Sequence, residues 1–200
     1  VGESGSGKSL TSLAIMGLLP ADVLRVTAGT IRLDGTEILT RSRRQLRAMR
    51  GDRMAMIFQE PMTALNPVMR VGDQIAEVLE THAGASRGDR RRRVLDAMEQ
   101  VHLPDVERVY RSFPHQLSGG QRQRIMIAMA LILEPALLIA DEPTTALDVT
   151  TQKQILSLIA EMQRVHGTAV LFITHDMGVV SDIAATVHVM RQGRVVENAP

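Results

Sequence analysis

The sequence predicts an α/β fold with a mainly parallel sheet and an inserted helical segment, and three features lead to this prediction. The stretch at 2–9 fits G-x-x-x-x-G-K-[ST], a pattern that joins a strand to a helix. Short apolar runs recur at 54–58, 136–140 and 169–174, as strands buried in a parallel sheet do. Between the first two runs, apolar residues recur at helical spacing. Strands that alternate with helices in this way are typical of α/β proteins.

The elements in the first third of the chain follow from local patterns. Apolar residues recur at helical spacing over 10–19, and Pro20 is expected to end that helix. Residues 30–33 alternate as a short strand does, and Asp34-Gly35 is a turn pair. The segment 41–53 is rich in arginine and mostly polar, which favours a solvated helix face.

The middle of the chain is predicted to be helical. Ile75, Val78 and Leu79 share one helix face, and apolar residues at 94–101 form a second such face. The basic run at 90–93 is interpreted as a solvated helix start. Nucleic-acid contact is the less favoured interpretation, because no aromatic side chains for base stacking accompany the run.

The last third of the chain predicts one more helix and a hairpin. The helix runs from Ile125 to the break at Glu134-Pro135, and Gln192-Gly193 joins two short runs at 187–190 and 194–197. We therefore expect a single domain over 1–200, with its core formed by 1–72 and 136–200 and a helical subdomain at about 73–135.

The composition is that of an ordinary globular domain and excludes several kinds of chemistry. The 200 residues are 44% hydrophobic and 22% charged, and the net charge of +1 gives no overall attraction to nucleic acid. The absence of cysteine excludes disulfides and cysteine-ligated metals. The longest apolar run, 125–133, is too short to span a bilayer. We expect a soluble, cytoplasmic chain that does not bind nucleic acid.

The loop at 2–9 is the first candidate site. Its glycines allow backbone N–H groups to surround phosphate oxygens, and the helix that follows points its positive end at them. Lys8 can reach the β and γ phosphates, and the Ser9 hydroxyl can bind Mg²⁺. We therefore assign nucleotide binding to a continuous set of residues: Gly2, Glu3, Ser4, Gly5, Ser6, Gly7, Lys8, Ser9 and Leu10.

Two adjacent carboxylates form the second candidate site. The apolar run before Asp141 and Glu142 predicts that both lie at the carboxyl edge of the sheet, where α/β folds bind ligands. Asp141 is suited to hold Mg²⁺, and Glu142 can act as a general base or orient the attacking water. Together with Lys8, these residues predict nucleotide hydrolysis.

A third motif predicts a second anion site in the same chain. It comprises Leu117, Ser118, Gly119, Gly120 and Gln121, with two glycines at a helix start and a serine hydroxyl beside them. One γ-phosphate does not need two such sites in one subunit. The simplest inference is that this motif serves a nucleotide held by another subunit.

These motifs, in this order, resemble those of ATP-binding-cassette (ABC) proteins. LSGGQ at 117–121 is similar to the family's signature motif, the loop at 2–9 to Walker A, and 136–142 to Walker B. Gln59 matches the Q-loop glutamine, Asp148 ends a D-loop, and His175 matches the switch histidine. The resemblance covers nearly the whole chain.

The resemblance implies a fold, a reaction and a set of roles. The fold is that of a P-loop NTPase, with a RecA-like core and an inserted helical subdomain. The reaction is hydrolysis of ATP with Mg²⁺, and ATP lies between Walker A of one subunit and the signature motif of its partner. The implied catalytic residues are Glu142, His175 and Gln59, and the implied metal ligands are Ser9, Gln59 and Asp141.

The resemblance also implies that the chain is a fragment, truncated at both ends. The family's adenine-stacking aromatic residue lies on strands upstream of Walker A, and the sequence starts at Val1 within that motif. We therefore expect most of the N-terminal β subdomain to be missing and adenine binding to be weak. The family's C-terminal extension would begin beyond Pro200.

Finer features resemble one branch of the family. The segment at 58–67 (FQEPMTALNP), the triplet at 114–116 and the segment at 140–148 (ADEPTTALD) are similar to ATPase subunits of bacterial dipeptide, oligopeptide, glutathione and nickel importers. This implies a second ABC ATPase subunit, two transmembrane permease subunits and an extracytoplasmic solute-binding protein. It places the chain peripherally on the cytoplasmic face of the inner membrane.

The cargo and the class of function leave alternatives. Peptides are favoured as cargo, with glutathione or nickel as alternatives in the same role. The remote alternative is a non-transport ABC ATPase of DNA repair or translation. Such proteins carry coiled coils, zinc modules or long linkers, and the sequence shows no heptads, no Cys₄ cluster and no long charged linker.

Overall fold

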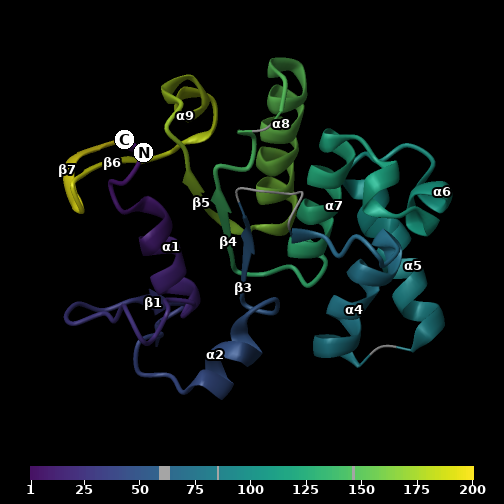
Figure 1. Cartoon of the computed structure of the whole chain (residues 1–200), viewed down its shortest axis with the longest axis horizontal. Helices are drawn as coiled ribbons and strands as arrows, with labels where there is room; N and C mark the ends of the chain where they lie inside the picture. The colour runs from purple at the N-terminus through teal and green to yellow at the C-terminus, as the bar shows by residue number, and fades with distance from the viewer. Residues whose placement is uncertain (59–63, 85, 146) are drawn as a thin grey trace.

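The fold was obtained as a computed structural model, which describes residues 1–58, 64–84, 86–145 and 147–200. Its centre is a parallel sheet of order β3-β4-β5, formed by β3 (Met54–Ile57), β4 (Leu137–Asp141) and β5 (Ala169–Ile173). Figure 1 shows this sheet between helices on both sides. All three strands coincide with the apolar runs, so the prediction of an α/β fold with a parallel sheet is confirmed.

The two faces of the sheet belong to two separate hydrophobic clusters. Side chains alternate along each strand, so Met54, Ile139 and Ile173 pack with Met16 on one face. On the other face, Ala55, Ile57 and Leu138 join a larger cluster. The first face is covered by α1 (Lys8–Met16) and α2 (Arg43–Met49), and the second by α7 (Gly119–Leu131) and α8 (Val149–His166).

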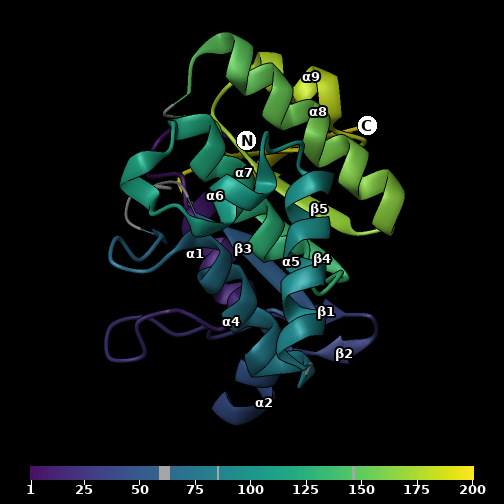
Figure 2. The same cartoon turned by 90° about the vertical axis from the view of Figure 1, so that its right-hand side faces the viewer.

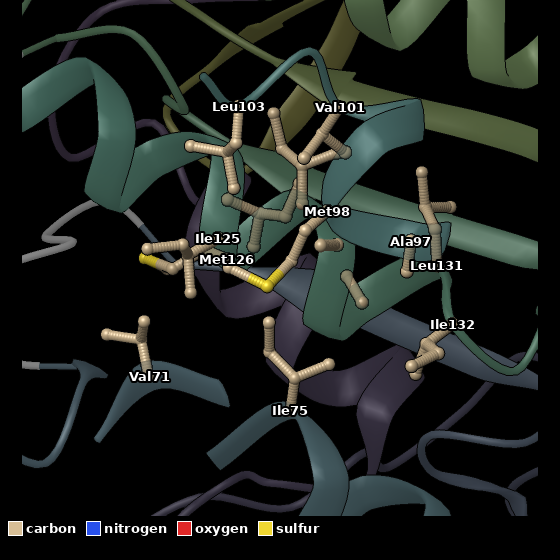
Figure 3. Close-up of a cluster of buried hydrophobic side chains, with 14 of the residues drawn as sticks. Val71, Ile75, Ala97, Met98, Val101, Leu103, Ile125, Met126, Leu131 and Ile132 are labelled. Carbon is tan, nitrogen blue, oxygen red and sulfur yellow. The ribbon is translucent and has the colours of Figure 1, made fainter. Parts of the chain in front are cut away.

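The larger cluster extends from the sheet into a group of helices: α4 (Val71–Ala83), α5 (Arg87–Gln100), α6 (Val106–Arg111) and α7, with the 3₁₀ turn η1 (Pro114–Gln116) before α7. Figure 1 shows this group beside the sheet, and in Figure 2 it lies in front of the sheet. In Figure 3, Ile75 of α4, Met98 of α5 and Ile125 of α7 converge in one buried core. The helices therefore share their core with the sheet instead of forming a separate one.

The helix boundaries differ from the prediction at three places. The first helix ends at Met16, because Gly17 takes a left-handed conformation and donates its N–H to the carbonyl of Ala14. The prediction that Pro20 ends this helix was wrong. The helix expected from Ile125 begins at Gly119, and α6 was not predicted, because six residues are too few to show a helical period.

The two basic runs are both on helices, as expected, but they differ in their partners. The run at 90–93 lies within α5 and pairs inside the helical group: Arg90 with Glu80 and Arg91 with Glu107. By contrast, α2 has no buried residue and presents a solvated arginine face. Both interpretations as helix segments are confirmed.

Among the residues that the structure describes, two antiparallel hairpins flank the sheet. One joins β1 (Arg32–Leu33) to β2 (Thr36–Glu37), and the other joins β6 (Val187–Arg191) to β7 (Arg194–Ala199) after the short helix α9 (Met177–Ile183). The second hairpin was predicted; for the first, the strand and its turn pair were predicted but β2 was not. Figure 1 shows the two termini beside the second hairpin, where Gly2 forms an isolated parallel bridge with Met190. A cavity of about 600 Å³ lies between β5 and this hairpin and reaches Lys8.

Candidate nucleotide site

The phosphate loop is wrapped around its own lysine. Lys8 is only 7% exposed, and its Nζ donates hydrogen bonds to the carbonyl oxygens of Gly2 (2.6 Å) and Glu3 (2.8 Å). Gly5 and Gly7 have positive φ angles of 78° and 102°, which glycine adopts without strain. The loop thus closes around the ammonium group of Lys8 at the start of α1. A positive charge at a helix N-terminus favours the binding of an anion.

The second hairpin, β6–β7, holds this loop by backbone hydrogen bonds. The N–H groups of Met190 and Gly193 donate to the carbonyls of Val1 (2.8 Å) and Ser6 (3.0 Å). A Cβ on Gly2 would lie 2.2 Å from the Met190 carbonyl oxygen, so no larger residue fits there. The Ser6 hydroxyl is buried and has no hydrogen-bond partner in the described part of the chain. A buried hydroxyl without a partner is costly unless a ligand satisfies it.

Asp141 meets the loop from the end of β4. It is 5% exposed, and its Oδ1 has no hydrogen-bond partner among the residues that the structure describes. Burial raises the pKa of this carboxyl, while a hydrogen bond with the Ser9 side chain lowers it; the neighbouring Glu142 raises it further and Lys8 lowers it. The sequence prediction that Ser9, Lys8 and Asp141 share one site agrees with this geometry.

Glu142 and His175 are brought together by neighbouring strands. Because Asp141 pairs with Ile173 in the parallel ladder, the residues that follow each strand lie side by side. His175 Nδ1 lies 3.1 Å from Glu142 Oε1, and the Thr145 hydroxyl donates to Glu142 Oε2 at 3.1 Å. The Glu142 side chain is 14% exposed and that of His175 is 58% exposed. Glu142 also has a left-handed backbone (φ 48°), held by its N–H bond to the Ile173 carbonyl.

The signature motif forms the start of α7. Ser118 caps the helix: it accepts the Gln121 N–H (3.2 Å) and donates its own N–H to the Gln121 side chain (3.0 Å). Leu117 is buried beneath this turn. Since α1 and α7 cover opposite faces of the sheet, the structure does not bring the signature motif onto the phosphate loop of the same chain (Figure 1).

The remaining predicted residues lie around these groups. Asp148 caps α8, accepting the N–H (2.9 Å) and the hydroxyl (2.6 Å) of Thr151. Leu10 is 48% exposed on α1, and Ser4 and Gly5 are exposed in the loop. Gln59 lies outside the described residues. Thr145 and Thr151 were not predicted, because a threonine three residues from an acidic residue is no signal by itself.

A groove of about 460 Å³ lies at the β3 edge of the sheet. Met16, Arg50 and Phe58 line one wall, and residues of α4 and α7 line the other, among them Val78 and Met129. Most of the lining side chains are apolar, with Arg50, Glu77 and His82 as charged or titratable members. The groove therefore lies between the sheet and the helical group, next to the end of β3.

Comparison with known families identifies the arrangement. The family model described as "ABC transporter" matches residues 1–145. The chain belongs to the ABC transporter family. The resemblance to ABC proteins was thus correctly identified from the sequence, and a solved ABC cassette shares the fold. That structure, the dimeric ATP-binding cassette MJ0796 in a post-hydrolysis state bound to ADP and Pi, has a TM-score of 0.85 and 30% identity, covering 99% of this chain and 82% of that one.

Curated relatives within the ABC family are peptide transport proteins by name. The probable peptide ABC transporter ATP-binding protein y4tR of Sinorhizobium fredii is 52% identical over 199 residues, and the probable D,D-dipeptide transport protein DdpD of Escherichia coli is 52% identical over 198. The oligopeptide transport protein AppD of Bacillus subtilis is 49% identical over 199 residues. These alignments cover 99–100% of this chain but only 59–61% of the relatives. Within its described part, this ABC chain has no helix long and apolar enough to cross a bilayer.

Proposed function

We propose that the chain is the ATP-hydrolysing part of a bacterial ABC importer that takes up di- or oligopeptides. The observation that carries this proposal is the junction of the phosphate loop with the ends of β4 and β5. There Lys8 and Ser9 influence Asp141, and Glu142 contacts His175 at 3.1 Å. A cation, a metal ligand and a candidate base thus occupy one edge of the sheet, as phosphoryl transfer to water requires.

The residues at this edge fit Mg²⁺. The buried Asp141 oxygen without a partner and the Ser9 hydroxyl are hard oxygen ligands, which Mg²⁺ prefers. We propose that Ser9 and Asp141 hold the ion, with Gln59 as a further ligand. When bound, the metal neutralises charge on the phosphates. The orphaned Ser6 hydroxyl lies in the same loop and is suited to donate to a phosphate oxygen.

Glu142 and His175 would act on the water and on the γ-phosphate. Contacts with the Thr145 hydroxyl and the His175 ring hold the Glu142 carboxylate in one orientation, which positions a general base before substrate arrives. His175 is more exposed and can turn from Glu142 toward the γ-phosphate when nucleotide binds. We therefore assign the base to Glu142 and contact with the γ-phosphate to His175.

The separation of the two anion sites supports a dimer as the working unit. The signature turn lies across the sheet from the phosphate loop, so its N–H groups are available to a nucleotide on another subunit. ATP would then hold two such subunits together, and hydrolysis would release them. We propose that the helices at about 73–135 form the part that carries the signature motif in this movement.

The groove beside β3 supports coupling to membrane subunits. Most of its lining is apolar, and it lies where the sheet meets the helical group, with Phe58 and Ala64 among its lining residues. We propose that it receives one of two permease subunits, which are fed by an extracytoplasmic solute-binding protein. This places the chain on the cytoplasmic face of the membrane. Peptide cargo rests on the names of the relatives; glutathione and nickel stay as alternatives, and a non-transport role in DNA repair or translation is remote.

The test uses the full-length protein with Glu142→Gln. We expect ATP turnover to fall by roughly 10²–10⁴-fold, because a general base is removed. ATP binding should be retained, so that Mg-ATP converts monomer into dimer in sedimentation. An alternative result, a monomer that binds ATP, would point to an obligate second ATPase subunit.

A matched control is available in the same chain. Glu134 also has a left-handed backbone (φ 52°), and its carboxylate also lies near a histidine, His166, at 3.8 Å. Glu134→Gln should leave turnover within about twofold of the parent protein, since it is a surface change away from the site. If Glu142→Gln hydrolysed ATP as fast as Glu134→Gln does, the role assigned to Glu142 would be wrong.

A further inference from the structure

The first turn of α7 packs against the first turn of α8 at very short range. A Cβ built on Gly120 would lie 2.8 Å from the Thr151 methyl carbon, closer than real Cβ contacts come. Gly120 is not among the glycines with positive φ, so its backbone conformation is one that any residue adopts. The absence of a side chain at 120 is therefore required by the approach of Thr151 and not by the backbone.

The neighbouring glycine differs. A Cβ on Gly119 would lie 3.6 Å from the Leu147 side chain, which is an ordinary van der Waals distance. On the side that faces its own chain, position 119 thus has room for a methyl group and position 120 does not. The two glycines of the motif have different structural requirements.

The Thr151 side chain is held in one orientation by Asp148. Its hydroxyl donates to Asp148 Oδ2 at 2.6 Å, and its backbone N–H donates to Asp148 Oδ1 at 2.9 Å. With the hydroxyl fixed, the methyl group is fixed as well, because both are attached to the same Cβ. The methyl group therefore presents a rigid contact to Gly120.

We propose that Thr151 is a positioning residue, whose methyl group fixes the position of the signature turn by packing on Gly120. Asp148 acts through it: the cap of α8 holds Thr151, and Thr151 holds the end of α7 whose N–H groups face outward. The functional effect of this contact rests on the proposed function, in which the signature turn binds the nucleotide of a partner subunit. It adds a role for Thr151 and a reason for glycine at 120.

A double-mutant cycle in the full-length protein tests this contact. Gly120→Ala, Thr151→Ser and the double variant are made in the Glu142→Gln background, and the ATP concentration for half-maximal dimerisation is measured. Thr151→Ser keeps the hydroxyl bound to Asp148 and removes only the methyl group. We expect Gly120→Ala to raise the half-maximal ATP concentration at least tenfold. Thr151→Ser should raise it about threefold, because the turn loses the methyl group that positions it, and the double variant should return to within about threefold of the parent. A Thr151→Ser variant that dimerised like the parent would show that the methyl group does not position the turn.

The control is Gly119→Ala, alone and with Thr151→Ser. Because position 119 does not contact Thr151, serine should not rescue any defect there. If Thr151→Ser fails to rescue Gly120→Ala as well, the glycine is required by something other than Thr151, and the proposal is overturned.

Melting temperatures separate this proposal from the proposed function. If the Glu142→Gln parent did not dimerise with ATP, the proposed function would fail, but the melting temperatures of the same four proteins would still report the contact. Gly120→Ala should lower the melting temperature and the double variant should recover it. Additive melting temperatures across the cycle would overturn the contact itself.

Discussion

At the scale of single residues, Asp141 destabilises the nucleotide-free fold at the position where its carboxylate is proposed to bind Mg²⁺. Its carboxyl is buried with one oxygen unpaired, and burial raises its pKa. A raised pKa in the folded state means that ionisation costs stability at pH values above it. We expect Asp141→Asn to raise the melting temperature of the nucleotide-free protein at pH 7, by roughly 2–4 °C for each kcal/mol of desolvation relieved. The gain should fade below about pH 4, where the aspartate is protonated in both states.

Asp148 serves as the control, because replacing it with asparagine should change the melting temperature in the opposite direction. Hydrogen bonds from Thr151 lower the pKa of Asp148, so its ionised form stabilises the fold above the ordinary aspartate pKa. Asp148→Asn should therefore lower the melting temperature at pH 7, and the difference should disappear as the pH falls through the folded pKa.

The role of Asp141 as a metal ligand has its own test. The rise in melting temperature that Mg-ATP gives to the parent protein should be lost in Asp141→Asn. A variant that kept it would show that Asp141 is not a metal ligand.

At the scale of elements, two serine helix caps allow an effect on stability to be distinguished from an effect on ATP-dependent dimerisation. Ser118 caps α7 and Ser86 caps α5 by the same bond to the N–H three residues on. Replacing either with alanine should cost about 0.5–2 kcal/mol in the free energy of unfolding, measured with urea. Only Ser118→Ala should also raise the ATP concentration needed for dimerisation, because α5 has no part in the site. Equal ATP requirements in both variants would contradict the assignment of the signature turn.

The elements also show what could be predicted from the sequence. Strands β3, β4 and β5 were predicted because buried parallel strands appear as short apolar runs, and Lys8, Ser9, Asp141 and Glu142 because their chemistry is local. The predicted end of α1 was wrong, because Leu18 and Leu19 continue the apolar pattern beyond the left-handed Gly17. The contacts of Glu142 with Thr145, and of Gly120 with Thr151, depend on strand register and helix packing, which no local pattern encodes.

At the scale of the whole molecule, one hydrophobic cluster connects the helical group to the sheet. Ile75 of α4 and Leu138 of β4 are both fully buried in it. We expect Ile75→Ala to cost roughly 2–5 kcal/mol through the cavity that it leaves. Because the core is shared, hydrogen exchange of amides in β4 should accelerate together with that of amides in α4. Val149→Ala, at an exposed position, should change neither.

A different result would change the description of the molecule. If only the amides of α4 lost protection, the helices would unfold as an independent unit, and the proposed subdomain at about 73–135 would be a separate folding unit. Coincident loss would mean that the signature turn and the carboxylates are stabilised by the same packing.

The support of the phosphate loop by the second hairpin has a consequence for synthesis. Val1 and Ser6 are made long before Met190 and Gly193, whose N–H groups hold them. Domains fold while the ribosome is still adding residues, at about 5–20 residues per second. The phosphate loop must therefore wait, as a nascent segment, until the hairpin has left the exit tunnel. Under the proposed function, a nucleotide in this loop would therefore stabilise the chain only after the hairpin has formed.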